Sequence, residues 1–64
     1  MNIADLITEA TKAGEEWSRG KSDEEIREGV EDAARVSFFE RNDKGRCNSE
    51  WQHWRYTFAI ACFR

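Results

Sequence analysis

The sequence predicts a small all-α domain of three helices, at about residues 2–18, 22–38 and 50–62, built on an N-terminal αα-hairpin. Three observations predict it. Apolar residues recur at helical spacing in the first two segments, a capping signal opens the second, and only a few residues join them. With 64 residues, the chain is expected to form a single small domain, residues 1–64, around one core.

The first helix is predicted from a stripe of apolar and small residues. At about 100° per residue these positions share one face. They are Ile3, Leu6, Ile7, Ala10, Ala13, Gly14 and Trp17. Asn2 is suited to cap the helix, and Asp5 stands in the first turn, where an acid favours the helix dipole. Gly20 is placed to end the helix in a left-handed conformation.

The second helix begins with a capping box, in which Ser22 caps and Glu25 reaches back. Behind the box, one face carries Ile26, Val30, Ala33, Ala34 and Ser37. The short connection predicts antiparallel neighbours. Small residues would let the first two helices approach closely, namely Ala10, Ala13, Gly14, Gly29, Ala33 and Ala34. The end of the second helix stays open, because residues 36–39 fit either its last turn or the start of a strand.

Residues 41–48 have the composition of a loop, and the segment after them fits two structures. Residues 54–63 alternate with a period of two, as a strand does, while Trp51, Trp54, Phe58 and Cys62 follow helical spacing. Residues 49–52 also form a second capping box, with Ser49 as the cap. A lone strand would need a pairing partner, whereas a helix satisfies its own backbone. A helix is therefore favoured, with an α+β fold, a helix pair plus a C-terminal β-hairpin or strand, as the alternative.

If this segment is a helix, three large residues lie away from its core face. Tyr56, Ile60 and Phe63 then fall roughly opposite Trp51 and Phe58. An apolar patch left exposed on that side would mark a surface for a partner.

The composition leaves little apolar material for a core, with 39% hydrophobic and 36% charged residues. The core must rest on the large residues Trp17, Phe38, Phe39, Trp51, Trp54, Phe58 and Phe63. Chains of this size often gain stability by association, so a homodimer is one expected state. Two cysteines and no apolar leader predict a cytoplasmic protein with free thiols. The longest apolar stretch has six residues, which excludes a membrane span.

Charge is distributed unevenly along the chain, whose net charge is −3. Residues 1–32 hold ten acids and four bases, a net −6, whereas residues 33–64 hold three acids and six bases, a net +3. Such asymmetry bears on partners rather than on fold. The second helix presents an acidic face made of Glu24, Glu28, Glu31 and Asp32.

No constellation of residues supports catalysis or a cofactor. The chain has one histidine, His53, and no glycine-rich turn that would accompany a Cys47–His53 pair as an oxyanion hole. Cys47, His53 and Cys62 are six and nine residues apart with no fourth Cys or His, which is not the paired spacing of a structural zinc site. We therefore expect no enzyme activity, no metal and no cofactor, and we expect both cysteines to pack as small hydrophobes.

These observations predict a non-enzymatic, protein-binding inhibitor or adaptor that attaches to a larger host protein. The expected binding residues are Glu24, Glu28, Glu31, Asp32, Trp54, Arg55, Tyr56 and Phe63. By analogy of size and composition, a phage protein that antagonises host defence, such as an anti-CRISPR-like protein, fits this class. The alternative is an RNA- or ribosome-associated protein that uses the basic, aromatic C-terminal half, although the acidic net charge makes nucleic acid a less favoured partner.

Overall fold

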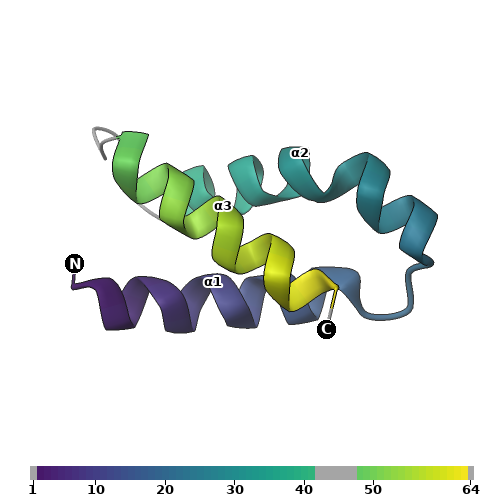
Figure 1. The fold of residues 1–64 in the computed structure, drawn as a ribbon, viewed down its shortest axis with the longest axis horizontal. Coiled ribbons are helices and arrows are strands. Elements are labelled where there is room, and N and C mark those ends of the chain that lie inside the picture. Colours follow the sequence, from purple (N-terminus) through teal and green to yellow (C-terminus); the bar gives the residue numbers. More distant parts are fainter. Residues whose placement is uncertain (1, 42–47, 64) are drawn as a thin grey trace.

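The structure, a computed structural model, describes residues 2–41 and 48–63 and consists there of three helices. They are α1 (Ile3–Ser18), α2 (Asp23–Arg41) and α3 (Asn48–Cys62). α1 and α2 run antiparallel, and α3 crosses both from the end of α2 to the end of α1 (Figure 1). This confirms the all-α domain of three helices, and the strand alternative for residues 54–63 was wrong.

The ends of α1 follow the predicted signals. The Asn2 side chain accepts a hydrogen bond from the Asp5 backbone N–H at 2.9 Å, which makes Asn2 the N-cap. Gly20 has a φ of +79°, the left-handed conformation predicted for the residue that follows the helix. Four residues, 19–22, then suffice to reverse the chain into α2.

α2 begins where the capping signal predicts and ends three residues later than predicted. Ser22 Oγ accepts from the Glu25 N–H at 3.3 Å and donates to the Glu25 carboxylate at 3.3 Å, so the carboxylate contacts the cap hydroxyl. Residues 36–39, whose structure was left open, are helical. They stay helical because Phe38 is fully buried and makes edge contacts with Trp51 and Trp54 of α3.

α3 begins two residues earlier than predicted, at Asn48. Ser49 therefore lies inside the helix, and the predicted second capping box is not the N-terminal cap. Of the predicted loop at 41–48, residues 42–47 lie outside the described residues, and Arg41 and Asn48 belong to α2 and α3. The helical spacing, and not the period of two, describes this segment.

The core is an aromatic cluster between the three helices. Trp54, Phe38 and Phe58 are its largest fully buried side chains, and Trp17 packs on Phe58 with ring centroids 5.8 Å apart. The smaller members of the core are Leu6, Ala10, Ala13, Ile26, Ala34 and Cys62. Of the seven large residues expected to form the core, Phe39 and Phe63 are exposed.

α1 packs mainly against α3, which corrects the expectation that small residues bring α1 and α2 together. A Cβ atom at Gly14 would stand 2.6 Å from the Phe58 carbonyl oxygen and 2.9 Å from Ala61 Cβ. α1 and α2 touch far less than either touches α3. Gly29 of α2 does face α1, where a Cβ atom would stand 3.1 Å from the Trp17 ring. α3 is therefore the element that holds the other two helices together.

Two buried polar atoms lack a hydrogen-bond partner among the described residues. They are Trp54 Nε1, a donor, and Glu9 Oε2, an acceptor. An unpaired buried polar group costs about 1–3 kcal/mol. Burial of the large Trp54 ring must therefore outweigh the desolvation of its N–H group.

Candidate functional site

α3 carries a stripe of large apolar side chains on the face turned away from the core. Tyr56, Ile60 and Phe63, which we call the apolar stripe, are spaced i, i+4, i+7 and are 61%, 60% and 48% exposed. Their places opposite Phe58 agree with the helical reading of the sequence. Large apolar groups aligned in this way are typical of a surface that a second molecule covers.

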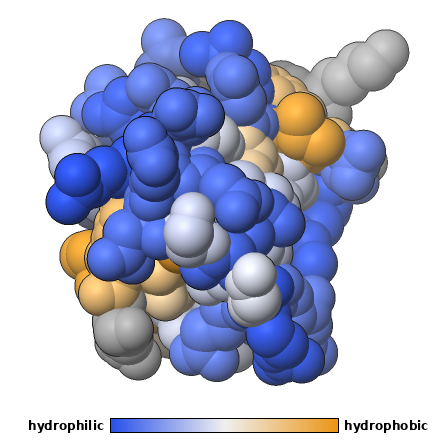
Figure 2. All heavy atoms as spheres, turned by 90° about the vertical axis from the view of Figure 1, so that its right-hand side faces the viewer, coloured by the Kyte–Doolittle hydropathy of each residue, from blue (hydrophilic) through white to orange (hydrophobic). Residues whose placement is uncertain are grey.

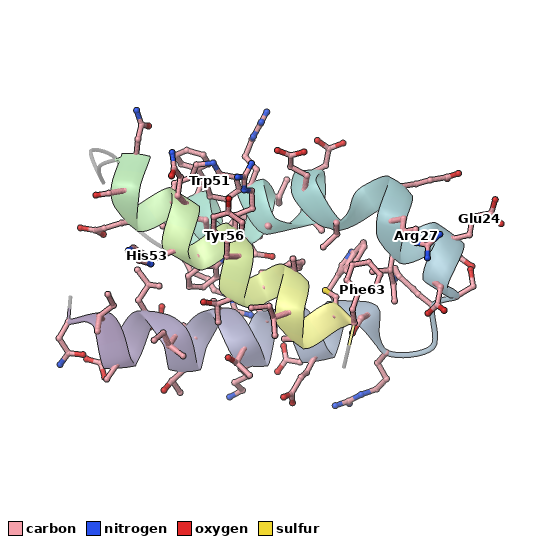
Figure 3. The ribbon with its side chains drawn as sticks, viewed as in Figure 1. Glu24, Arg27, Trp51, His53, Tyr56 and Phe63 are labelled. Atoms are coloured by element: carbon pink, nitrogen blue, oxygen red, sulfur yellow. The ribbon has the colours of Figure 1, made fainter. Side chains whose placement is uncertain are left out.

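α2 carries a second stripe with the same spacing. Glu24, Glu28 and Glu31, which we call the acidic stripe, stand at i, i+4, i+7 and are exposed, and the exposed Arg27 and Arg35 share this face of the helix. Glu24 and Arg27, at the start of α2, lie at the same end of the molecule as Phe63, while Trp51 and His53 lie toward the other end (Figure 3). α2 and α3 run in opposite directions (Figure 1), and Glu31 of the acidic stripe and Tyr56 of the apolar stripe line the same groove.

A groove separates the two helices on this face. Val30 and Glu31 of α2 and Arg55, Tyr56 and Ala59 of α3 line it, and it encloses about 180 Å³ with mainly apolar walls. We call it the α2–α3 groove. By contrast, the end of the molecule at the α1–α2 turn is mainly hydrophilic (Figure 2).

Arg55 links the two stripes. Its Nη1 donates to Glu31 Oε1 at 3.0 Å, and its guanidinium lies 5.1 Å from the centre of the Tyr56 ring. An exposed ion pair of this kind contributes at most about 1 kcal/mol to stability. Its effect here is geometric, because it holds Glu31, Arg55 and Tyr56 together at one wall of the groove.

The predicted binding residues separate into three groups. Glu31, Arg55 and Tyr56 line the α2–α3 groove, and Glu24, Glu28 and Phe63 are exposed farther along α2 and just after the end of α3. We call these six residues the α2–α3 face. Asp32 is exposed but lines a different groove, between α1 and α2, together with Trp17 and Val36. Trp54 is wholly buried, so its prediction as a surface anchor was wrong. Its side chain points into the core because it lies between Trp51 and Phe58 on the inner face of the helix.

Sequence reasoning missed Val30 and Ala59 as groove residues. Val30 follows the core spacing of α2 and Ala59 is small, so neither stands out in the sequence. Both are only partly buried, because they flank the line along which α2 and α3 meet. A groove between elements far apart in the chain has no local sequence signal.

The residues considered for metal binding do not converge in the part of the chain that the structure describes. Cys62 is buried, His53 is exposed, and Cys47 lies outside the described residues. Within residues 2–41 and 48–63, no group of three His, Cys, Asp or Glu side chains is arranged to hold a metal ion. Cys62 packs as the small hydrophobe that the sequence predicts, and its Sγ donates to the Gly14 carbonyl at 3.5 Å.

We expect Cys62 to react slowly with thiol reagents. Burial raises the pKa of the Cys62 thiol, and a hydrogen bond with the Ser18 side chain only partly opposes that rise. Since the thiolate is the reactive form, a raised pKa leaves less of it at any given pH below the pKa. In a Cys47→Ser protein, modification by Ellman's reagent at pH 8 should be at least about tenfold slower than in denaturant. Equal rates in the native and denatured protein would contradict the burial of Cys62.

The described residues form a small three-helix domain with large apolar side chains exposed along the outer side of α3. No protein-family model matches the chain, and searches of the curated proteins and of the solved structures give no significant match. Across the helices described, none has the length and apolar character needed to cross a membrane. The exposed residues of α2 and α3 are therefore the features of this chain that bear on its function.

Proposed function

We propose that this protein is a non-catalytic binding module that attaches to a larger protein through its α2–α3 face, as an inhibitor or adaptor. The apolar stripe is the observation that carries the proposal. Three large side chains are aligned and at least 48% exposed, although the core of this small domain is short of apolar material. Aromatic residues in the centre of a contact surface commonly supply most of its binding energy.

The RNA-binding alternative has less support from the described residues. Among the aromatic and basic residues of the C-terminal half, Trp54 is buried, Trp51 stacks on Phe39, and Arg55 is paired with Glu31. Arg46 lies outside the described residues. A role in antagonising host defence, and a phage origin, stay predictions from size and composition.

Replacing two of the three residues of the apolar stripe should weaken partner capture. We expect a tagged Tyr56→Ser/Ile60→Ser protein to lose at least about tenfold in affinity for a protein that the wild type retains from a bacterial lysate, because each anchor contributes more than about 1 kcal/mol. Capture is read by mass spectrometry with and without nuclease. Both side chains are exposed, so the far-UV circular dichroism spectrum should not change.

The matched control is Ile3→Ser/Val36→Ser, which removes two side chains that are 57% and 54% exposed but lie on α1 and α2. This control should retain the partner. If the control loses the partner while the Tyr56→Ser/Ile60→Ser protein keeps it, the binding face is elsewhere. A capture that disappears with nuclease would instead favour the RNA-associated alternative.

A further inference from the structure

The α2–α3 groove has room for one side chain of another molecule. It encloses about 180 Å³, and an apolar protein cavity of about 150 Å³ is large enough to bind a benzene ring. We propose that the groove receives one neutral aromatic side chain of the partner protein. This inference rests on the protein-binding function proposed above, and it assigns the place where an anchor residue of the partner enters the α2–α3 face.

The apolar walls of the groove come from Val30 of α2 and Ala59 of α3. Both residues are half-buried and line the groove from opposite helices. Arg55 and Tyr56, about one turn before Ala59, have long side chains, so the single methyl group of Ala59 leaves a hollow beside them. A side chain with an apolar surface is stabilised when it leaves water for these walls.

The charged groups that line the groove neutralise each other. Arg55 Nη1 donates to Glu31 Oε1 at 3.0 Å, and the other lining residues are uncharged. Along the rest of α2, the exposed Arg27 and Arg35 share the face of the acidic stripe, so both signs of charge surround the groove. A cationic occupant would meet Arg55, an anionic occupant would meet Glu31, and either would lose part of its hydration. The groove therefore favours a neutral side chain.

Tyr56 and Arg55 distinguish an aromatic ring from an aliphatic side chain of similar size. The Tyr56 ring is 61% exposed and lines the groove, so an entering ring can pack edge-to-face against it. The Arg55 guanidinium lies 5.1 Å from the centre of the Tyr56 ring, and a second ring can offer its π face to the same cation. An aliphatic side chain would gain only the burial of its surface.

Titration with side-chain analogues tests the chemistry of the groove. The first probe is 4-methylphenol, which has the structure of the tyrosine side chain, and the second is its saturated counterpart 4-methylcyclohexanol. Butylammonium and butanoate represent the cationic and anionic side chains. We expect 4-methylphenol to shift the NMR signals of Val30 and Ala59 with a millimolar dissociation constant, because a single small ring supplies little binding energy. The other three probes should bind at least about threefold more weakly.

Two results of these titrations would overturn the proposal. One is the absence of shifts at Val30 and Ala59 with 4-methylphenol. The other is an equal affinity for any of the three remaining probes, since the groove would then not select a neutral aromatic ring.

Substitution of Ala59 tests whether the ring occupies the groove. Ala59→Leu fills the groove with an apolar side chain and should remove the shifts that 4-methylphenol causes, without a change in the far-UV circular dichroism spectrum. The matched control, Ala4→Leu, adds the same atoms at an exposed position of α1 and should leave the titration unchanged. Tyr56→Leu, at an exposed position outside the core, should weaken 4-methylphenol about twofold to tenfold. Unchanged binding in Ala59→Leu and Tyr56→Leu would contradict the groove as the site.

Capture from a bacterial lysate separates the failure of this inference from the failure of the proposed function. Ala59→Leu should lose the protein that the wild type retains, while Ala4→Leu should keep it. If Tyr56→Ser/Ile60→Ser loses that protein and Ala59→Leu keeps it, the binding function stands and the groove inference is wrong. If both variants keep it, the binding face proposed above is itself wrong. If sedimentation shows a wild-type dimer that Ala59→Leu dissociates, the ring comes from a second copy of this chain and the inference is overturned.

Discussion

Replacing Trp54 with alanine should unfold the protein or lower its melting temperature by at least about 12 °C. Trp54 is wholly buried and packs edge-on against Phe38 at 5.7 Å. Truncation of a buried tryptophan costs about 3–5 kcal/mol, and a chain of this length is stable by only about 3–10 kcal/mol. Thermal melts followed by far-UV circular dichroism measure the change. A Trp54→Ala protein with the melting temperature of the wild type would contradict the burial of Trp54.

Trp54→Phe is the matched control for this substitution. It keeps an aromatic ring in the core and removes the Nε1 group, which has no hydrogen-bond partner among residues 2–41 and 48–63. The phenylalanine ring is smaller and packs less well, but the protein no longer has to bury an unpaired N–H group. The free energy of unfolding should therefore fall by less than about 2 kcal/mol. A loss of unfolding free energy as large as that of Trp54→Ala would contradict this expectation.

Gly14→Ala should destabilise the protein by about 1–2 kcal/mol, against the usual preference for alanine in a helix. The added methyl group would stand 2.6 Å from the Phe58 carbonyl oxygen, and a backbone atom in a packed helix cannot move aside cheaply. α1 and α3 would have to separate where they are closest, next to the bond from Cys62 Sγ to the Gly14 carbonyl. Urea denaturation of both proteins measures the difference in unfolding free energy.

Gly29→Ala is the comparison, because it tests the same substitution in α2. Its methyl group would meet the Trp17 ring at 3.1 Å, and that half-buried side chain can shift by a few tenths of an ångström. The gain in helix propensity should then prevail and stabilise the protein by about 0.5–1 kcal/mol. If both substitutions stabilise the protein, the close α1–α3 contact at Gly14 is incorrect.

The residues of the α2–α3 face could be predicted only in part from the sequence. Helical spacing placed Tyr56, Ile60 and Phe63 on the side of α3 opposite its core residues, and the structure exposes all three. The same spacing puts Trp54 beside Trp51 and Phe58, on the core side of the helix. The prediction of Trp54 as a binding residue rested on the frequency of tryptophan in binding sites. Residue type misled the prediction, because a domain of this size needs its largest side chains inside.

The features of this protein that the sequence alone determined are those that depend on local interactions. The signals at the helix ends involve residues only a few positions apart, namely the cap at Asn2, the left-handed Gly20 and the cap at Ser22. The sequence therefore predicts where these helices start or end. Only the tertiary structure decided that α3 packs against both other helices and approaches α1 at Gly14. It also decided that Arg55 meets Glu31, 24 residues away, at the α2–α3 groove. These features depend on which helix faces cross and how closely, and helical periodicity describes the faces without fixing their partners.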